Sequence, residues 1–161
     1  MFKHIMVAID GSPYSQQALP TVIEVARKFQ SDVLVLHVCE HDRGRAVVYS
    51  NESPAQATQL VGNAVRLISM AGITAEGRLN DVAAGHVAKS IVETASINNV
   101  DLIVMGSRGL SDVQGMLLGS VTHQVIKMAN IPVLVDRTRR VKEPVAETAP
   151  HETRQTTLVS S

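Results

Sequence analysis

Short apolar runs alternate with amphipathic segments along the whole chain, and this alternation restricts the fold more than any other feature. Five runs are rich in Val, Ile and Leu: Ile5–Ile9, Val33–Val38, Ile73–Leu79, Leu102–Met105 and Pro132–Val135. Continuous apolar runs of this length predict strands buried on both faces. The third run alternates more with polar residues, which favours a place near an edge. The fourth run is the most apolar, and we expect it at the centre of the sheet.

Four segments with helical spacing lie between these runs. Two of them begin with Ser followed by Pro, at Ser12–Pro13 and Ser53–Pro54, which is typical of an N-cap and a first-turn proline. Gly72 is expected to end the second helix. Asp81 is expected to cap the third, and the fourth runs from about Gly119 to Ala129.

This order of elements defines an α/β protein. Strands that alternate with helices predict a five-stranded, parallel, doubly wound sheet, as the middle layer of a three-layer open sandwich with four helices. Ligands of such sheets bind beyond the carboxyl ends of the strands. Residues 1–136 form one expected domain. Residues 137–161 carry few large aliphatic side chains and are expected to be a disordered C-terminal tail.

Charge and composition exclude several classes of function. The 161 residues contain 15 basic and 15 acidic side chains and only two Phe, two Tyr and no Trp. Neither a basic field nor a set of stacking rings is present, so we expect no binding to nucleic acid or to a membrane. One cysteine rules out an internal disulfide and any metal site built from several cysteines. With no apolar run of about 20 residues and no signal peptide, the expected location is cytoplasmic.

The glycine-containing segment after the fourth run carries the clearest chemical signal. Two residues separate Gly106 from Gly109, and nine separate Gly109 from Gly119–Ser120. Glycines at a strand end allow close approach of a ligand, and the free amides of a helix start suit a phosphate. The hydroxyls of Ser120 and Thr122 and the guanidinium of Arg108 would add contacts to the same anion. From the spacing alone, turn residues in a plain loop are an equally good explanation. The P-loop and dinucleotide fingerprints are absent.

The same spacing, G-x2-G-x9-G-[ST], resembles that of the nucleotide-binding type of universal stress proteins. The segments around it, 100–105 and 130–135, and the opening segment 4–12 are similar to that family as well. The resemblance covers about residues 3–136. It implies an adenine nucleotide alpha-hydrolase-like fold with strand order 3-2-1-4-5.

The resemblance also implies a ligand and a set of contacts. The ligand would be ATP, with AMP or another adenine nucleotide as the alternative and Mg²⁺ as a candidate companion ion. The family commonly dimerises through its last strand, here Pro132 to Asp136. The implied nucleotide contacts lie at strand ends and at the start of the fourth helix: Ala8, Ile9, Asp10, Val38, Met105, Gly106, Arg108, Gly109, Gly119, Ser120, Val121 and Thr122.

Single polar residues outside the glycine segment have simpler interpretations. Asp10 either contacts the ligand, which we favour, or closes the turn before Ser12. His37 and His41 straddle a strand end and are expected to face solvent, and Cys39 is expected to be a small buried hydrophobe.

No nucleophile with a positioned base is visible. The hypothesis is therefore a regulatory ATP-binding protein with slow or absent hydrolysis. A weak ATPase or self-phosphorylating enzyme, and a nucleotide-free adaptor, are the alternatives.

Overall fold

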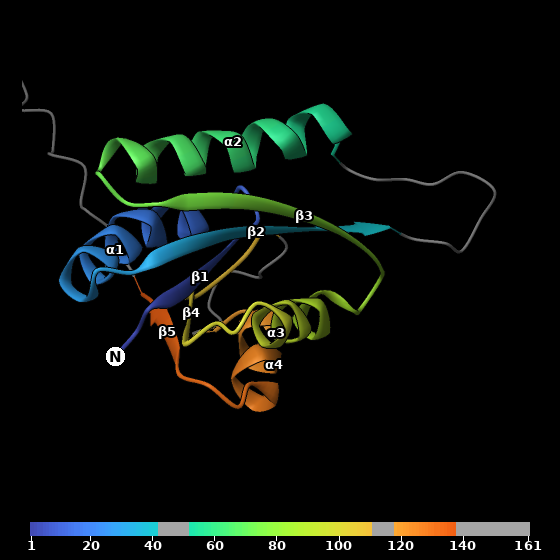
Figure 1. Cartoon of the computed structure of the whole chain (residues 1–161). Coiled ribbons are helices and arrows are strands. Elements are labelled where there is room, and N and C mark those ends of the chain that lie inside the picture. The colour runs from blue at the N-terminus through green and yellow to red at the C-terminus, as the bar shows by residue number, and fades with distance from the viewer. Residues whose placement is uncertain (42–51, 111–117, 138–161) are drawn as a thin grey trace, which may run out of the picture.

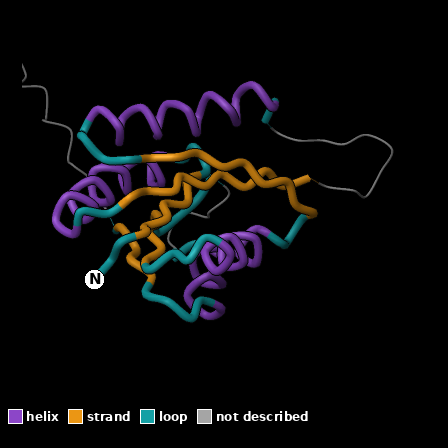
Figure 2. Tube along the Cα trace, in the orientation of Figure 1, coloured by secondary structure: helices purple, strands orange, loops and turns teal. Residues whose placement is uncertain are grey.

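The computed structural model describes residues 1–41, 52–110 and 118–137, and these residues form a parallel sheet covered by helices on both faces (Figure 1, Figure 2). The strands pair in the order β3-β2-β1-β4-β5, and each pair is parallel. This arrangement confirms the expected fold class and strand order. The elements in chain order are β1 (His4–Ile9), α1 (Pro13–Phe29), β2 (Asp32–His41), α2 (Pro54–Met70), β3 (Ala75–Ala83), α3 (Val87–Ile97), β4 (Leu102–Gly106), α4 (Ser120–Met128) and β5 (Val133–Asp136).

Alternation along the strands divides the core into two halves. On β1, the side chains of Ile5, Val7 and Ile9 pack with α1 and α2, whereas Met6 and Ala8 pack with α3 and α4. The same parity holds on β2, where Val33 and Val35 join the α1–α2 side. Because successive side chains of a strand point to opposite faces, each strand end presents different residues to the two sides.

The starts of the first two helices follow the capping chemistry expected from the sequence. The Ser12 side chain accepts a hydrogen bond from the amide of Ser15, and Ser53 forms a capping box with Gln56. Gly72 follows α2 with a φ of +81°, a conformation that favours glycine. These local signals therefore predict the boundaries well.

Two expectations about the strands are wrong. Asp81 does not cap α3, because β3 continues through it to Ala83, and the N-cap of α3 is His86 without a side-chain hydrogen bond. The central strand is β1 and not β4, although all five residues of β4 are buried. The third strand does lie at an edge, as its more polar pattern predicts.

The pairing of β2 with β3 extends beyond the rest of the sheet. β1 ends opposite His37, whereas β2 and β3 stay paired up to His41 and Ala83. This two-stranded extension runs beyond the carboxyl end of β1, and Val38, Cys39 and Glu40 on it line the site described below.

The expected tail, 137–161, lies almost wholly outside the described residues, which end at Arg137. Within the described parts of the chain, none of the helices combines the length and the apolar character that crossing a bilayer requires.

Candidate functional site

A cleft of about 270 Å³ opens at the carboxyl ends of β1, β2 and β4. All twelve residues that the resemblance nominates line it: Ala8, Ile9, Asp10, Val38, Met105, Gly106, Arg108, Gly109, Gly119, Ser120, Val121 and Thr122. They come from three strand ends, two loops and the first turn of α4, so the fold brings together segments far apart in sequence. The position agrees with the rule that open α/β sheets bind ligands at this edge.

The α3–α4 side of the cleft is apolar. Ala8, Val38 and Met105 pack in the core half formed with α3 and α4, and Val121 packs against the same group. These side chains offer a surface on which a flat ring can rest, while specificity has to come from backbone groups at the strand ends.

Asp10 closes the turn that follows β1. Its Oδ1 accepts a hydrogen bond from the amide of Ser12 at 2.9 Å, and its Oδ2 accepts one from the amide of Leu110 at 3.0 Å. Asp10 therefore does close the turn before Ser12, which was the alternative to a ligand contact. The second bond also joins the β1 turn to the loop after β4, so Asp10 fixes the distance between the two loops that border the cleft.

Gly106 is required by close packing against α1. A Cβ at this position would lie 2.7 Å from the carbonyl carbon and oxygen of Tyr14, closer than side-chain carbons approach backbone. The first glycine of the motif therefore lets the start of α1 pack closely on the end of β4. The sequence suggested close approach of a ligand here, and the backbone that approaches is the protein's own.

Among the described residues, the start of α4 presents backbone donors toward the cleft that have no hydrogen-bond acceptor. The first bond within the helix is donated by the amide of His123 to the carbonyl of Gly119, so the amides of residues 120–122 precede it. Gly119 is the N-cap, and its own amide donates to the carbonyl of Ser107 at 2.7 Å. Such a helix start is well suited to an anion.

The two hydroxyls of this turn differ in role. Thr122 is buried, and its Oγ1 donates to the carbonyl of Gly106 at 3.0 Å, so its proton is used within the protein. Ser120 is exposed at the first position of the helix. Of the two hydroxyls predicted to contact phosphate, Ser120 is the one whose hydroxyl makes no hydrogen bond within the described residues.

Arg108 lies over an aromatic ring. Its guanidinium carbon is 5.4 Å from the centre of the Tyr14 ring, and Nη1 donates to the Tyr14 hydroxyl at 3.3 Å. This contact holds the charge at the border of the cleft, where the remaining guanidinium donors can meet an anion. Tyr14 was not expected at the site.

Three further side chains in the cleft were missed or misread from the sequence. His37 does not face solvent: it is 4% exposed, its Nδ1 lies 2.8 Å from the carbonyl oxygen of Ile9, and its Nε2 lies 2.6 Å from Oε2 of Glu52. Cys39 is partly exposed rather than fully buried. Burial raises the pKa of the Cys39 thiol, and the negative charges of Asp81 and Glu52 raise it further.

The misreading of His37 has a simple origin. The predicted strand stops at Val38, so His37 is taken as a residue at a strand end, whereas β2 continues to His41. Alternation with Val33 and Val35 would have placed His37 on the α1–α2 face of a longer strand. His41, also expected in solvent, is partly exposed, and its Nε2 lies 2.8 Å from Oδ1 of Asp81. No pattern in the sequence around Glu52 predicts that this residue lines the cleft.

Fold and cleft together define an open α/β sheet protein with a ligand site at the carboxyl edge. The sequence model described as the universal stress protein family matches residues 1–137, which is most of the chain. This protein therefore belongs to the universal stress protein family.

Curated relatives agree with this assignment. The chain is 33% identical to universal stress protein YxiE of Bacillus subtilis, over 85% of this chain and all of that protein. It is 32% identical to a universal stress protein of Thermus aquaticus, again over 85% of this chain and all of the relative.

Solved structures show the same fold, and some contain nucleotides. The structure of hypothetical protein MJ0577 has a TM-score of 0.72 and 28% identity, covering 86% of this chain and 98% of that one. A universal stress protein from Archaeoglobus fulgidus in complex with dAMP has a TM-score of 0.63 and 26% identity, covering 84% and 97%. A universal stress protein in complex with cAMP has a TM-score of 0.65 and 25% identity, covering 86% of this chain and 98% of that one.

Proposed function

We propose that the cleft binds an adenine nucleotide, with ATP as the ligand, and that the protein is a regulatory binding module of the stress response in the cytoplasm. The observation that carries the proposal is the meeting of all twelve nominated residues in one cleft of the described structure. Two solved relatives hold dAMP and cAMP, which supports an adenine nucleotide here.

The cleft offers a separate environment for each part of a nucleotide. The apolar side around Val38 and Met105 suits the base, whereas the amides at the start of α4 and the guanidinium of Arg108 suit the phosphates. ATP is preferred over AMP because the glycine segment and the helix start together offer several donors. A Mg²⁺ ion that accompanies ATP would be held mainly by phosphate oxygens and water, with Asp10 as the carboxylate of the β1 turn.

Slow or absent hydrolysis is the second part of the proposal. The acidic residues that line the described cleft are Asp10, Glu40 and Glu52. Asp10 accepts two backbone amides, Glu40 accepts the amide of Gly85, and Glu52 faces His37. Because each carboxylate already serves a contact within the protein, none is a clear base for an attacking water.

The test uses the purified full-length chain. Nucleotide extracted from it is identified by mass spectrometry, and ATP, AMP and cyclic AMP are then titrated by calorimetry. We expect saturable binding, tightest for ATP, with phosphate release absent or very slow over hours. Absence of binding by any adenine nucleotide at millimolar concentration would leave the nucleotide-free adaptor as the function. Phosphate release at many turnovers per hour would make the protein an ATPase.

The proposal includes a homodimer that pairs through β5. This strand is the last of the described sheet, and the amide of Ile103 donates to the carbonyl of Pro132. In a parallel pair, alternate residues direct their backbone groups to opposite edges, so the amide of Val133 points away from β4.

A proline at position 133 therefore tests the dimer. Val133→Pro removes an outward donor and should leave the β4–β5 pairing intact, since proline is tolerated at edges. We expect the mass measured by light scattering to fall from dimer to monomer, with an unchanged circular dichroism spectrum. A dimer that survives this substitution would place the interface elsewhere.

A further inference from the structure

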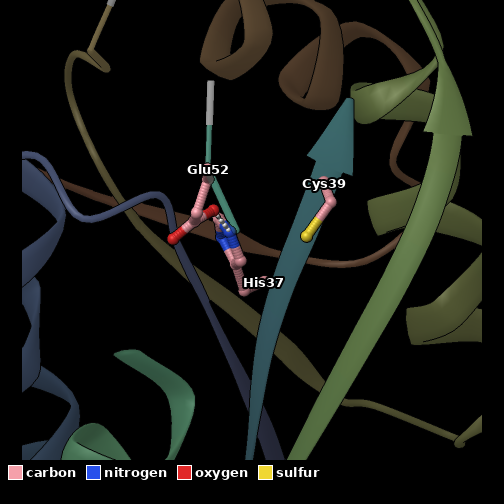
Figure 3. Close-up of side chains that lie close together, drawn as sticks. All are labelled: His37, Cys39 and Glu52. Atoms are coloured by element: carbon pink, nitrogen blue, oxygen red, sulfur yellow. Dashed lines mark hydrogen bonds and ion pairs between the residues drawn. The ribbon is translucent and has the colours of Figure 1, made fainter. Parts of the chain in front are cut away.

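A mixed nitrogen, sulfur and oxygen cluster lies on the α1–α2 side of the cleft. Nε2 or Nδ1 of His37, Sγ of Cys39 and a carboxylate oxygen of Glu52 come within 4.8 Å of one another (Figure 3). Neither the glycine motif nor the α4 helix start contributes to this cluster, and nothing in the proposed nucleotide contacts uses it.

The orientation of His37 is fixed by a backbone carbonyl. Nδ1 lies 2.8 Å from the oxygen of Ile9, and a carbonyl oxygen only accepts, so Nδ1 carries the proton. The 2.6 Å contact between Nε2 and Oε2 of Glu52 is a hydrogen bond and therefore contains a second proton; loss of that proton leaves the Nε2 lone pair directed at the position now occupied by Glu52. A carbonyl that holds the far nitrogen of a histidine is the usual outer contact of a metal-binding imidazole.

The other two donors are held by regular structure. Cys39 follows His37 by two residues on β2, so both side chains project from the same face of the strand. Glu52 directly precedes the capping box of α2, in which the Ser53 amide donates to Oε1 of Gln56 at 2.8 Å and the Gln56 amide donates to Ser53 Oγ at 3.2 Å. A strand and a helix start thus position the three donors, as a preformed site requires.

We propose that His37, Cys39 and Glu52 form a three-ligand site for a zinc-class transition metal ion. A neutral imidazole, a thiolate and a carboxylate together carry two negative charges, which balance a divalent ion. This donor set suits zinc and cobalt, whereas Mg²⁺ and Ca²⁺ require oxygen ligands. A tetrahedral zinc would separate the donor atoms by about 3.4–3.6 Å. To reach this spacing, the His37–Glu52 contact has to lengthen from 2.6 Å, and Sγ, which lies within 4.8 Å of the other two donors, has to approach them.

Binding displaces protons in a defined way. The thiol proton of Cys39 leaves for solvent, and so does any proton shared between His37 and Glu52, so that each ligand presents a lone pair to the ion. The three residues line the cleft, and the fourth position of a tetrahedral ion would face it. Three protein ligands with an exchangeable fourth position are typical of zinc that binds water or a small molecule rather than of closed structural zinc.

The test is a titration of the nucleotide-free, full-length protein with Co²⁺ and then with Zn²⁺. We expect one equivalent of Co²⁺ to produce tetrahedral visible bands together with a thiolate-to-cobalt band in the near ultraviolet, and Zn²⁺ to bleach both. Cys39 is the only cysteine in the chain, so the near-ultraviolet band assigns the sulfur ligand without ambiguity. Omission of nucleotide separates this result from the proposed ATP binding.

Variants assign the other two ligands. Cys39→Ser should abolish the near-ultraviolet band, and His37→Gln and Glu52→Gln should each lower cobalt affinity by at least about 100-fold. His4→Gln is the matched control, because His4 is exposed at the opposite end of β1, and it should bind cobalt as the unchanged protein does. Circular dichroism of each variant establishes that it folds, and Cys39→Ala serves as a second sulfur-free variant.

Three results would overturn the proposal. One is absence of any thiolate band with the unchanged protein at one equivalent of cobalt. Another is a band that persists in folded Cys39→Ser. The third is equal cobalt affinity in His37→Gln, Glu52→Gln and His4→Gln, which would reduce the cluster to a buried ion pair beside a cysteine.

Discussion

The two sides of the cleft differ in chemistry although they belong to the same edge of one sheet. On the α3–α4 side, Ala8, Val38 and Met105 present apolar side chains beside the amides of the α4 start. On the α1–α2 side, His37, Cys39 and Glu52 gather ionisable groups. The difference follows from strand alternation: Val38 points to one face of the sheet, and its neighbours at 37 and 39 point to the other. Adjacent residues on β2 can therefore serve two unrelated ligands.

Substitutions that disable each side of the cleft separately test most directly whether the two sides bind different ligands. Gly119→Val adds a branched side chain at the N-cap of α4 and should lower ATP affinity at least about 100-fold, or about 2.7 kcal/mol. His37→Gln should lower cobalt affinity at least about 100-fold and leave ATP affinity within about threefold, a change below 0.7 kcal/mol. Calorimetry with ATP and absorption with Co²⁺ measure the two effects. If both variants lose both ligands, the cleft is one site and not two.

The next largest effect concerns Gly106, at the carboxyl end of β4. Gly106→Ala places a Cβ 2.7 Å from the Tyr14 carbonyl, and we expect a loss of about 3 kcal/mol in the free energy of unfolding. Gly62→Ala is the matched control, since it lies in α2 with nothing within 4 Å of a new Cβ and should gain up to about 1 kcal/mol. Urea unfolding measures both. Equal free energies of unfolding of the two variants would mean that the packing of α1 on β4 does not require glycine at position 106.

A smaller effect separates the two hydroxyls of the first α4 turn. Thr122→Val leaves the buried Gly106 carbonyl without its donor and should cost about 1–2 kcal/mol of stability. Ser120→Ala should change stability by less than about 0.5 kcal/mol while weakening ATP binding. A stable Thr122→Val protein with weakened ATP binding would reverse these assignments.

The smallest effect lies at the opposite end of the sheet, away from both ligands. Oδ2 of Asp101 accepts the amides of Lys3 and His4 at 2.7 and 2.9 Å, and these bonds hold the pKa of Asp101 below its usual value. A depressed carboxyl pKa contributes stability that is complete above the ordinary value, about 3.9, and lost as the pH falls through the lowered one.

Asp101→Asn should therefore cost about 1 kcal/mol at neutral pH. The difference from the unchanged protein should shrink below about pH 4. Thermal unfolding between pH 3 and 7 measures it, and ligand affinities at pH 7 should be unchanged. A difference that stays constant with pH would contradict the role of the charge.

The sequence predicted what depends on local pattern. Apolar runs located every strand, Ser–Pro pairs located two helix starts, and the spacing from Gly106 to Ser120 located the α4 side of the cleft. Asp81 failed as a cap because a polar residue on an edge strand looks the same as one before a helix. His37 was misread because the predicted strand ended too early, and its contact with Glu52 was missed because the two residues are 15 apart in sequence and no spacing rule describes such a pair.

The extension of β2 and β3 beyond the sheet has a mechanical consequence. Among the described strands, β3 is the one that pairs with residues 38–41 of β2, whereas the ends of β1 and β4 are held by the contacts of Asp10 and Thr122. A two-stranded ribbon twists and bends more readily than a wide, covered sheet. We therefore expect the wall formed by residues 38–41 of β2 to bend more readily than the ends of β1 and β4 when ligands of different size are bound.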